Sequence, residues 1–130
     1  MSKEILTHPV IQEIVDKGRV PLSLATRGGG LIFVGGLPPL NLDTGELVTG
    51  NIEEQTAASL NAIKTVLEAN GSDMSKIMKT TVFAVNAGMF DRVNDAYRQF
   101  FPKDPPARTF VTVGSWPWPF DIEIEAIALA

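Results

Sequence analysis

Two segments near the carboxyl end of the chain alternate between apolar and polar side chains, as β-strands do. They are residues 105–113 and residues 121–127, the second of which repeats Ile-Glu. Each strand can therefore place one set of side chains in a core and the other set toward a cavity or a partner. Residues 114–120 between them hold two tryptophans and two prolines. This composition predicts an irregular segment that forms a subunit contact or a pocket wall, with the contact favoured.

The first third of the chain predicts a short helix followed by a β-hairpin. Residues 9–17 begin with a proline, pair apolar residues four positions apart and stop at a glycine. Residues 20–26 and 31–34 are each typical of a strand, and residues 27–30 supply a glycine-rich turn between them. Because that turn precedes a strand where phosphate-binding loops need a helix, we expect no phosphate site there.

The middle of the chain predicts an amphipathic helix and a buried strand. Asn51 can cap the helix, Glu54 completes a capping box, and Asn70-Gly71 ends it. Residues 77–85 are rich in β-branched side chains and predict a strand covered on both faces. The stripe of the helix that should face the core consists of Ile52, Thr56, Leu60, Ile63 and Leu67.

A second helix follows Asn86, which can cap it, and ends before Pro102. Its aromatic stripe is far more typical of a core than of a cofactor site. Asn94 lies at the edge of this stripe, where its amide needs either a backbone partner or a ligand, and we favour the backbone partner. The stripe consists of Phe90, Val93, Tyr97, Phe100 and Phe101.

This order of elements predicts a two-layer α+β fold, with a mixed sheet of about six strands and two main helices on one face. We expect residues 1–19 to form an N-terminal extension with a short helix, and residues 20–130 to form a single domain. The other sheet face would then expose apolar side chains, which favours self-association with a site between subunits. The apolar residues expected on that face are Leu22, Leu24, Phe110 and Ile127.

Composition narrows the possible chemistry. The 130 residues are 45% hydrophobic without any membrane-length apolar run, and the first residues lack signal-peptide character, so a soluble cytoplasmic protein is the default expectation. The chain has no cysteine and a single histidine, His8, which argues against thiolate catalysis, a His-based triad or a multi-His metal site. A formal charge of −4 argues against nucleic-acid binding.

Arg108 and Glu123 interrupt the two carboxyl-terminal strands and form the predicted chemical centre. An arginine fixed on a strand presents a planar fork of donors that fits a carboxylate, and a glutamate on a nearby strand can hold or activate a water molecule. The alternatives are an interface ion pair for Arg108 and an outward-facing carboxylate for Glu123, which spacing alone slightly favours. Gly35 and Gly36 either make a bend or let backbone N–H groups approach a ligand.

Several short strings occur in an order that covers residues 20–128. The most specific are Lys-Thr-Thr-Val-Phe at residues 79–83, Pro-Ala-Arg-Thr at 106–109 and Ile-Glu-Ile-Glu-Ala-Ile-Ala at 122–128. The others are Phe-Val-Gly-Gly at 33–36, Asp-Thr-Gly-Glu at 43–46, Gln55-Thr56, and Phe90 with Asn94 and Tyr97. In this arrangement the chain resembles the RidA/YjgF family of reactive-intermediate deaminases.

The resemblance implies a chorismate-mutase-like homotrimer that carries its sites between subunits and needs no metal or organic cofactor. It implies hydrolysis of enamine or imine acids, such as 2-aminoacrylate, to 2-oxo acids and ammonia. Arg108 resembles the family's substrate-carboxylate arginine and Glu123 its water-positioning glutamate. The remaining positions that it places around the substrate are Asn94, Gly35, Gly36, Phe90, Phe110 and Leu22.

Three departures from the family pattern make the pocket less polar. A pocket tyrosine is replaced by Leu22, a Ser-Gly-Gln string by Gly35-Gly36-Leu37, and a small residue two positions after the arginine by Phe110. We therefore expect an imine or enamine deaminase that takes a bulkier or more apolar acid. The alternative is a non-catalytic protein that binds a small carboxylate. A ribonuclease, a label attached to some relatives, is the least favoured because of the acidic charge.

Overall fold

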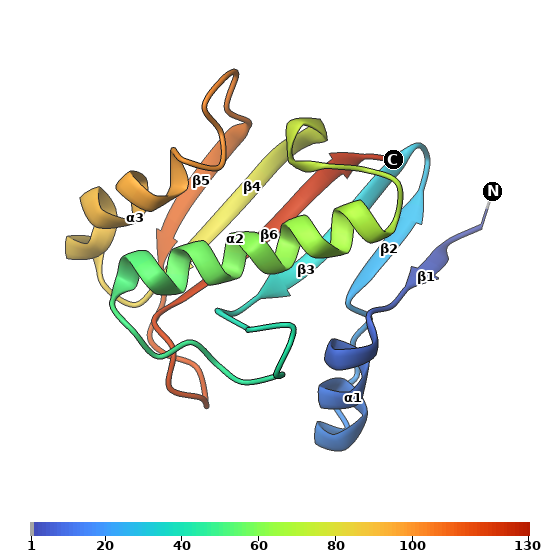
Figure 1. Cartoon of the computed structure of the whole chain (residues 1–130), viewed down its shortest axis with the longest axis horizontal. Helices are drawn as coiled ribbons and strands as arrows, with labels where there is room; N and C mark the ends of the chain where they lie inside the picture. The colour runs from blue at the N-terminus through green and yellow to red at the C-terminus, as the bar shows by residue number, and fades with distance from the viewer. Residues whose placement is uncertain (1) are drawn as a thin grey trace.

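The computed structural model describes residues 2–130 and is built on one six-stranded sheet with strand order β1-β2-β3-β6-β4-β5 (Figure 1). β4 and β5 run parallel, and the other neighbouring strands run antiparallel, so the sheet is mixed as predicted. The strands are β1 (Glu4–Leu6), β2 (Ala25–Gly28), β3 (Leu31–Leu37), β4 (Ile77–Ala84), β5 (Ala107–Thr112) and β6 (Ile122–Leu129).

Two helices cover one face of the sheet, which confirms the two-layer α+β architecture. α2 (Ile52–Ala69) crosses the sheet, and α3 (Phe90–Tyr97) lies beside it near β5 (Figure 1). α1 (Pro9–Gly18) matches the predicted short helix and lies beyond the other edge, near β1 and β2. Short 3₁₀ turns at Met74–Lys76 and Ala87–Met89 lead into β4 and α3. Asn86 caps the second of these turns, not α3 itself.

α2 begins at its predicted cap, and its apolar residues recur with the spacing of a helix. Asn51 Oδ1 accepts a hydrogen bond from the Glu54 backbone N–H at 2.8 Å, and Glu54 Oε1 accepts one from the Asn51 N–H at 3.4 Å. This capping box satisfies backbone donors that the first helical turn leaves free. All residues of the predicted stripe, from Ile52 to Leu67, are buried against the sheet. The prediction for α2 is therefore confirmed.

The hairpin of β2 and β3 is present, but its first strand is displaced from the prediction. Gly29 and Gly30 occupy the turn with φ angles of 61° and 79°, a region that favours glycine. The turn therefore falls within the predicted residues 27–30, but β2 (Ala25–Gly28) begins at Ala25 rather than at residue 20 and includes the first two residues of the predicted turn. The residues before it approach the hairpin as irregular chain, in which Leu24 is buried.

The second face of the sheet is open in a single copy. Along β4, Thr80, Val82 and Ala84 are buried under the helices, whereas Lys79 and Thr81 are only half-buried on the other face. The prediction that this strand is covered on both faces is therefore wrong for one copy. The predicted set of open-face residues is corrected as well, because Leu24 is buried and Phe110 packs on the helix side. Exposed apolar residues that do lie there are Ile5, Phe33, Val111 and Leu129.

The N-terminal residues take part in the main core. β1 adds an edge strand by pairing with β2, with Leu6 opposite Ala25. Leu6 and Ile11 of α1 are both 4% exposed and belong to the same apolar cluster as the interior of the sheet. The expected N-terminal extension is therefore packed onto the domain in its described part.

Candidate active site

Arg108 projects from β5 toward the helix layer without a carboxylate partner. Its Cζ lies 4.8 Å from the centre of the Tyr97 ring and 5.6 Å from that of the Phe90 ring, both on α3. Among residues 2–130 no carboxylate lies within ion-pair distance of the guanidinium. Aromatic faces attract a cation without occupying its N–H donors. The arginine is therefore supported from one side and free to bind an external anion.

A cleft of 680 Å³ opens beside this guanidinium, and Asn94 lines it. The Asn94 Oδ1 atom is buried and has no hydrogen-bond partner in the part of the chain that the structure describes. A buried acceptor without a partner costs free energy and is unusual in native proteins. The structural partner favoured for Asn94 is therefore absent from residues 2–130. The other residues lining the cleft are Tyr97, Arg98, Phe101, Pro102, Pro105, Pro106 and Arg108.

Phe90 and Phe110 form the aromatic pair next to Arg108. Their ring centres are 5.1 Å apart and their planes meet at 89°, an edge-to-face geometry that aromatic pairs prefer. Phe90 remains 42% exposed, although it was predicted to belong to a core stripe. Phe90, Asn94, Arg108 and Phe110 therefore lie together on the helix side of the sheet.

Glu123 lies on the opposite, open face at the start of β6. It packs over the backbone of Gly36 so closely that a Cβ built on Gly36 would lie 2.7 Å from Glu123 Cδ and closer still to Oε1. Burial raises the pKa of the Glu123 carboxyl, and the charge of Glu125 on the same face raises it further. Glycine at position 36 is thus what allows this half-buried carboxylate to sit against the strand.

Arg108 and Glu123 are not neighbours within one chain. The strand register pairs Thr80 of β4 with Arg108 of β5, and Phe83 of β4 with Glu123 of β6. The two residues are therefore separated by about 10 Å along the strands and about 10 Å across them, and their side chains point to opposite faces. One chain by itself therefore does not bring Arg108 and Glu123 into one site, and the expected site between subunits stays a prediction.

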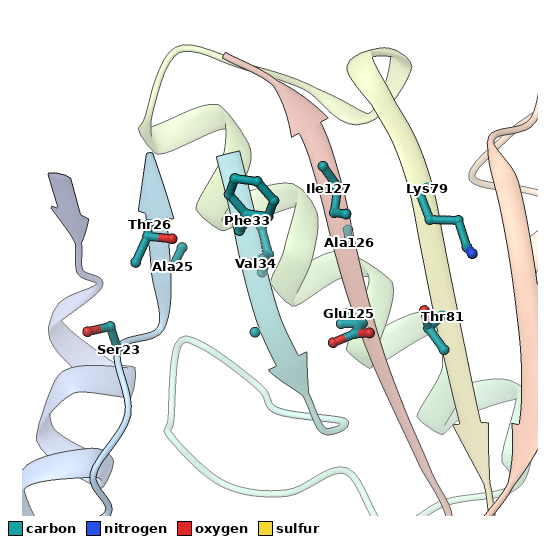
Figure 2. Close-up of a pocket in the computed structure, with 11 residues that line it drawn as sticks. Ser23, Ala25, Thr26, Phe33, Val34, Lys79, Thr81, Glu125, Ala126 and Ile127 are labelled. Atoms are coloured by element: carbon teal, nitrogen blue, oxygen red, sulfur yellow. The ribbon is translucent and has the colours of Figure 1, made fainter. Parts of the chain in front are cut away.

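The open face also carries a smaller hollow of 290 Å³ (Figure 2). Phe33, Ile127 and Lys79 lie side by side across β3, β6 and β4, and Gly35 and Glu125 line the same hollow. Leu22 precedes β2, is 54% exposed and lines none of the cavities described here. The structure therefore places Gly35 with the Glu123 face and leaves Leu22 at the surface.

Residues 16–130 match the family model described as Endoribonuclease L-PSP. A RutC family protein of Pyrococcus abyssi is 37% identical over 98% of both chains. A 2-iminobutanoate/2-iminopropanoate deaminase of Dermatophagoides farinae is 32% identical over 98% of this chain and 96% of its own. The structure of the Rid family protein YyfA of Yersinia pestis superposes with a TM-score of 0.87 at 34% identity, over 99% of this chain and all of YyfA.

The chain belongs to the RidA/YjgF family. Its architecture is that of the solved family members, and the match to YyfA extends over α1 as well. Some relatives are named imine deaminases, and these names describe those relatives. Among residues 2–130 no cluster of three or more His, Asp or Glu side chains could hold a metal ion. None of the helices in that range is long and apolar enough to cross a membrane.

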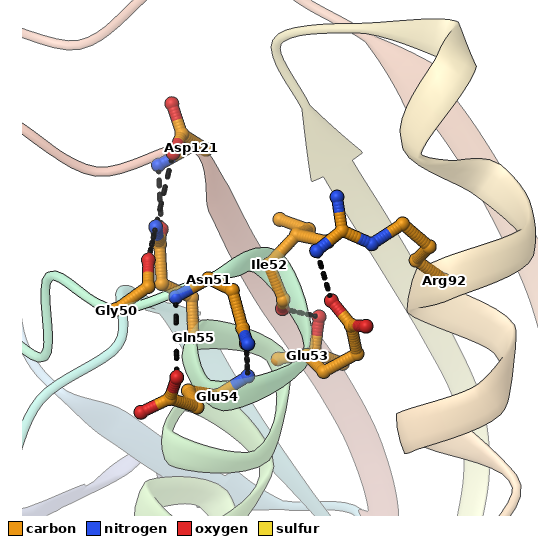
Figure 3. A network of polar contacts seen from close by, with 9 residues as sticks. Gly50, Asn51, Ile52, Glu53, Glu54, Gln55, Arg92 and Asp121 are labelled. Carbon is orange, nitrogen blue, oxygen red and sulfur yellow. Dashed lines mark hydrogen bonds and ion pairs between the residues drawn. The ribbon is translucent and has the colours of Figure 1, made fainter.

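One string shared with the RidA/YjgF family, Gln55-Thr56, has a structural role that the sequence analysis did not assign. Gln55 Nε2 donates to the Gly50 carbonyl and to Asp121 Oδ2, and Gln55 Oε1 accepts from the Asp121 N–H, each at 2.9 Å (Figure 3). These bonds tie the first turn of α2 to the residue just before β6. Glu123 lies two residues further on, so Gln55 fixes the start of the strand that carries it.

Proposed function

We propose that this protein hydrolyses 2-imino acids and their enamine tautomers to 2-oxo acids and ammonia, in a site shared by two copies of the chain. The observation that carries this proposal is the unpaired Arg108 guanidinium beside the unpartnered Asn94 Oδ1 in one cleft. A free guanidinium fits a carboxylate bidentately, and the Asn94 oxygen can accept a hydrogen bond from a substrate N–H.

The reaction needs little from the protein beyond orientation. The imine carbon is already electrophilic, particularly when the nitrogen is protonated. Water adds to that carbon, the resulting carbinolamine loses ammonia, and the 2-oxo acid remains, so that one water is consumed for each ammonia released. Arg108 holds the substrate carboxylate, and a group that accepts a proton from the attacking water completes the site.

Glu123 of a second copy is the proposed partner for this step. Its pKa is raised by burial and by Glu125, which suits a carboxylate that takes up a proton during catalysis and gives it to the departing amine. The open face that carries Glu123 also exposes Ile5, Phe33 and Leu129, which self-association would remove from water. We propose a closed homotrimer in which this face of one copy meets the Arg108 edge of the next.

The cleft favours a substrate with a bulky apolar side chain. Tyr97, Phe101 and three prolines form most of its wall. Phe110 adds a ring beside Phe90 and Arg108, at a position where a small residue is typical of the family. We therefore expect imines of leucine or phenylalanine type to be better substrates than 2-aminoacrylate.

A carboxylate-binding protein of the same fold is the second candidate, because an apolar wall around Arg108 also suits a ligand that is held without turnover. RNA cleavage is disfavoured by the net charge of −4 and by a cleft whose lining holds only two cations, Arg98 and Arg108. A cleft with so few cations also lacks the positive charge needed to bind an anionic membrane surface or a phosphate backbone.

The proposal is tested with imino acids made in situ by an L-amino-acid oxidase. The protein should speed ammonia release above the spontaneous rate. Arg108→Ala should abolish the effect, and Arg108→Lys should restore little of it because lysine lacks the planar fork. Arg92→Ala, which removes an exposed guanidinium outside the cleft, is the matched control and should retain activity. Saturable binding of 2-oxo acids without acceleration of any imine would favour the second candidate instead.

A further inference from the structure

The Tyr97 side chain is the closest support of Arg108, and sequence reasoning placed it in the core only. Its ring centre lies 4.8 Å from Arg108 Cζ, and its hydroxyl lies 2.7 Å from Thr80 Oγ1. We infer that Tyr97, anchored by Thr80, is a positioning residue that aims the Arg108 guanidinium at the substrate carboxylate. This inference rests on the proposed function.

The guanidinium needs such a support because it has no counter-ion. A paired arginine is oriented by its carboxylate, whereas Arg108 has no carboxylate within ion-pair distance in the described chain and lies over two aromatic rings. When a ligand orders a long flexible side chain, the lost conformational entropy lowers the affinity. A ring that holds the guanidinium in place before the substrate arrives removes part of that cost.

The Tyr97 ring is itself held in place, by the hydrogen bond to Thr80 and by packing against Phe101. Tyr97 is 6% exposed and Thr80 is fully buried. Phe101 packs on the ring with a centre-to-centre distance of 4.8 Å. Burial raises the pKa of the Tyr97 phenol, against smaller opposing effects of the Thr80 hydrogen bond and the Arg108 charge. The phenol therefore stays protonated at neutral pH, as a hydrogen bond between two hydroxyls requires.

Strand register places the anchor next to the residue that it serves. Thr80 on β4 is the direct neighbour of Arg108 on β5, and both side chains face α3. Tyr97 reaches from α3 to Thr80 and thereby passes beneath the guanidinium. Phe101 packs on the Tyr97 ring but also lines the cleft, so its removal would affect the substrate directly. Phe100, three residues after Tyr97, packs against the same core and lines none of the cavities described above, which makes it the control.

The test compares Tyr97→Leu with Phe100→Leu by steady-state kinetics on an imino acid and by calorimetric affinity for 4-methyl-2-oxopentanoate. Both changes remove a ring that packs on the core, so both should lower the free energy of unfolding. Only Tyr97→Leu should raise KM and Kd, by about 2- to 30-fold, the range that the loss of a cation–π contact gives. The value of kcat should change less than KM. Tyr97→Phe, which keeps the ring, should recover most of the affinity.

Equal KM and Kd values in Tyr97→Leu and the wild type, or an equal rise in Phe100→Leu, would overturn the inference. If Tyr97→Leu does not fold, Thr80→Val and Tyr97→Phe decide, because each removes the anchoring hydrogen bond alone. Each should then raise Kd by about 2- to 5-fold, and unchanged values in both would overturn the inference. Arg108→Ala distinguishes a failure of this inference from a failure of the proposed function. If that variant binds the 2-oxo acid as well as the wild type does, the proposed function itself fails.

Discussion

Glu123 occupies space that only a glycine at position 36 leaves open. A Cβ on residue 36 would overlap the end of the Glu123 side chain and would also lie 3.0 Å from its Cγ. The carboxylate would have to move away, while the backbone of Gly36 could accept an alanine because its φ angle is not positive. The identity of residue 36 therefore sets the place of the proposed catalytic carboxylate.

Gly36→Ala should reduce turnover about as strongly as Glu123→Ala and leave the free energy of unfolding within about 1 kcal/mol of the wild type. Gly114→Ala is the matched control, because a Cβ there meets nothing within 4 Å. Activity assays and urea unfolding measure the two effects. A Gly36→Ala protein with normal kcat would remove Glu123 from the mechanism.

The raised pKa of Glu123 gives a pH-dependent prediction. A carboxyl whose pKa is higher folded than unfolded contributes its full stability below the unfolded pKa and loses it as the pH rises through the folded pKa. Glu123→Gln should therefore unfold at higher urea than the wild type at pH 7.5, and this advantage should disappear near pH 4. Glu68→Gln, on the exposed side of α2, should show neither change. A less stable Glu123→Gln protein at pH 7.5 would mean that a cation facing Glu123 outweighs burial.

Asn94 should matter for binding more than for folding. Because its Oδ1 has no partner in residues 2–130, removing it costs the fold little. Asn94→Ala should weaken binding of imino or 2-oxo acids by about 2- to 10-fold and keep stability within about 1 kcal/mol. Calorimetry and urea unfolding test this, with the exposed Asn61→Ala on α2 as control. A large loss of stability with unchanged affinity would assign Asn94 to the fold.

Gln55 should be more important for stability than the ion pair beside it. Gln55→Leu removes three hydrogen bonds and leaves the Asp121 N–H and carboxylate without their partner, which should cost about 2–4 kcal/mol. Arg92→Ala breaks the partly exposed 2.8 Å ion pair with Glu53 (Figure 3) and should cost less than about 1 kcal/mol. Urea unfolding of both variants compares them directly. Similar losses would contradict the anchoring role of Gln55.

Local sequence signals predicted the elements well. Asn51 and Glu54 marked the start of α2, and the Ile-Glu repeat marked β6. β1 was missed because three residues are too few to show a period. The sequence predicts Tyr97 only as a core residue, because an aromatic at helical spacing gives no sign of what lies above its ring.

The relation between Arg108 and Glu123 could not be predicted from the chain. Alternation shows that Arg108 shares a face with Phe110, and Glu123 with Glu125, but not which face is which. That choice depends on how β5 and β6 align on the two sides of β4, including the irregularity between Ile77 and Lys79. Pairing between distant strands is a property of the whole sheet, and it places the two residues on opposite faces.

The most direct test of a site shared by two copies is subunit complementation. Arg108→Ala and Glu123→Gln chains, each with little activity alone, are unfolded together in equal amounts, refolded and assayed for imine hydrolysis, with each variant refolded alone as control. In a closed ring, about one quarter of the sites then combine an intact Arg108 with an intact Glu123. The mixture should recover about one quarter of the activity of refolded wild-type protein. Activity that stays at the level of the separate variants would contradict a site built between copies.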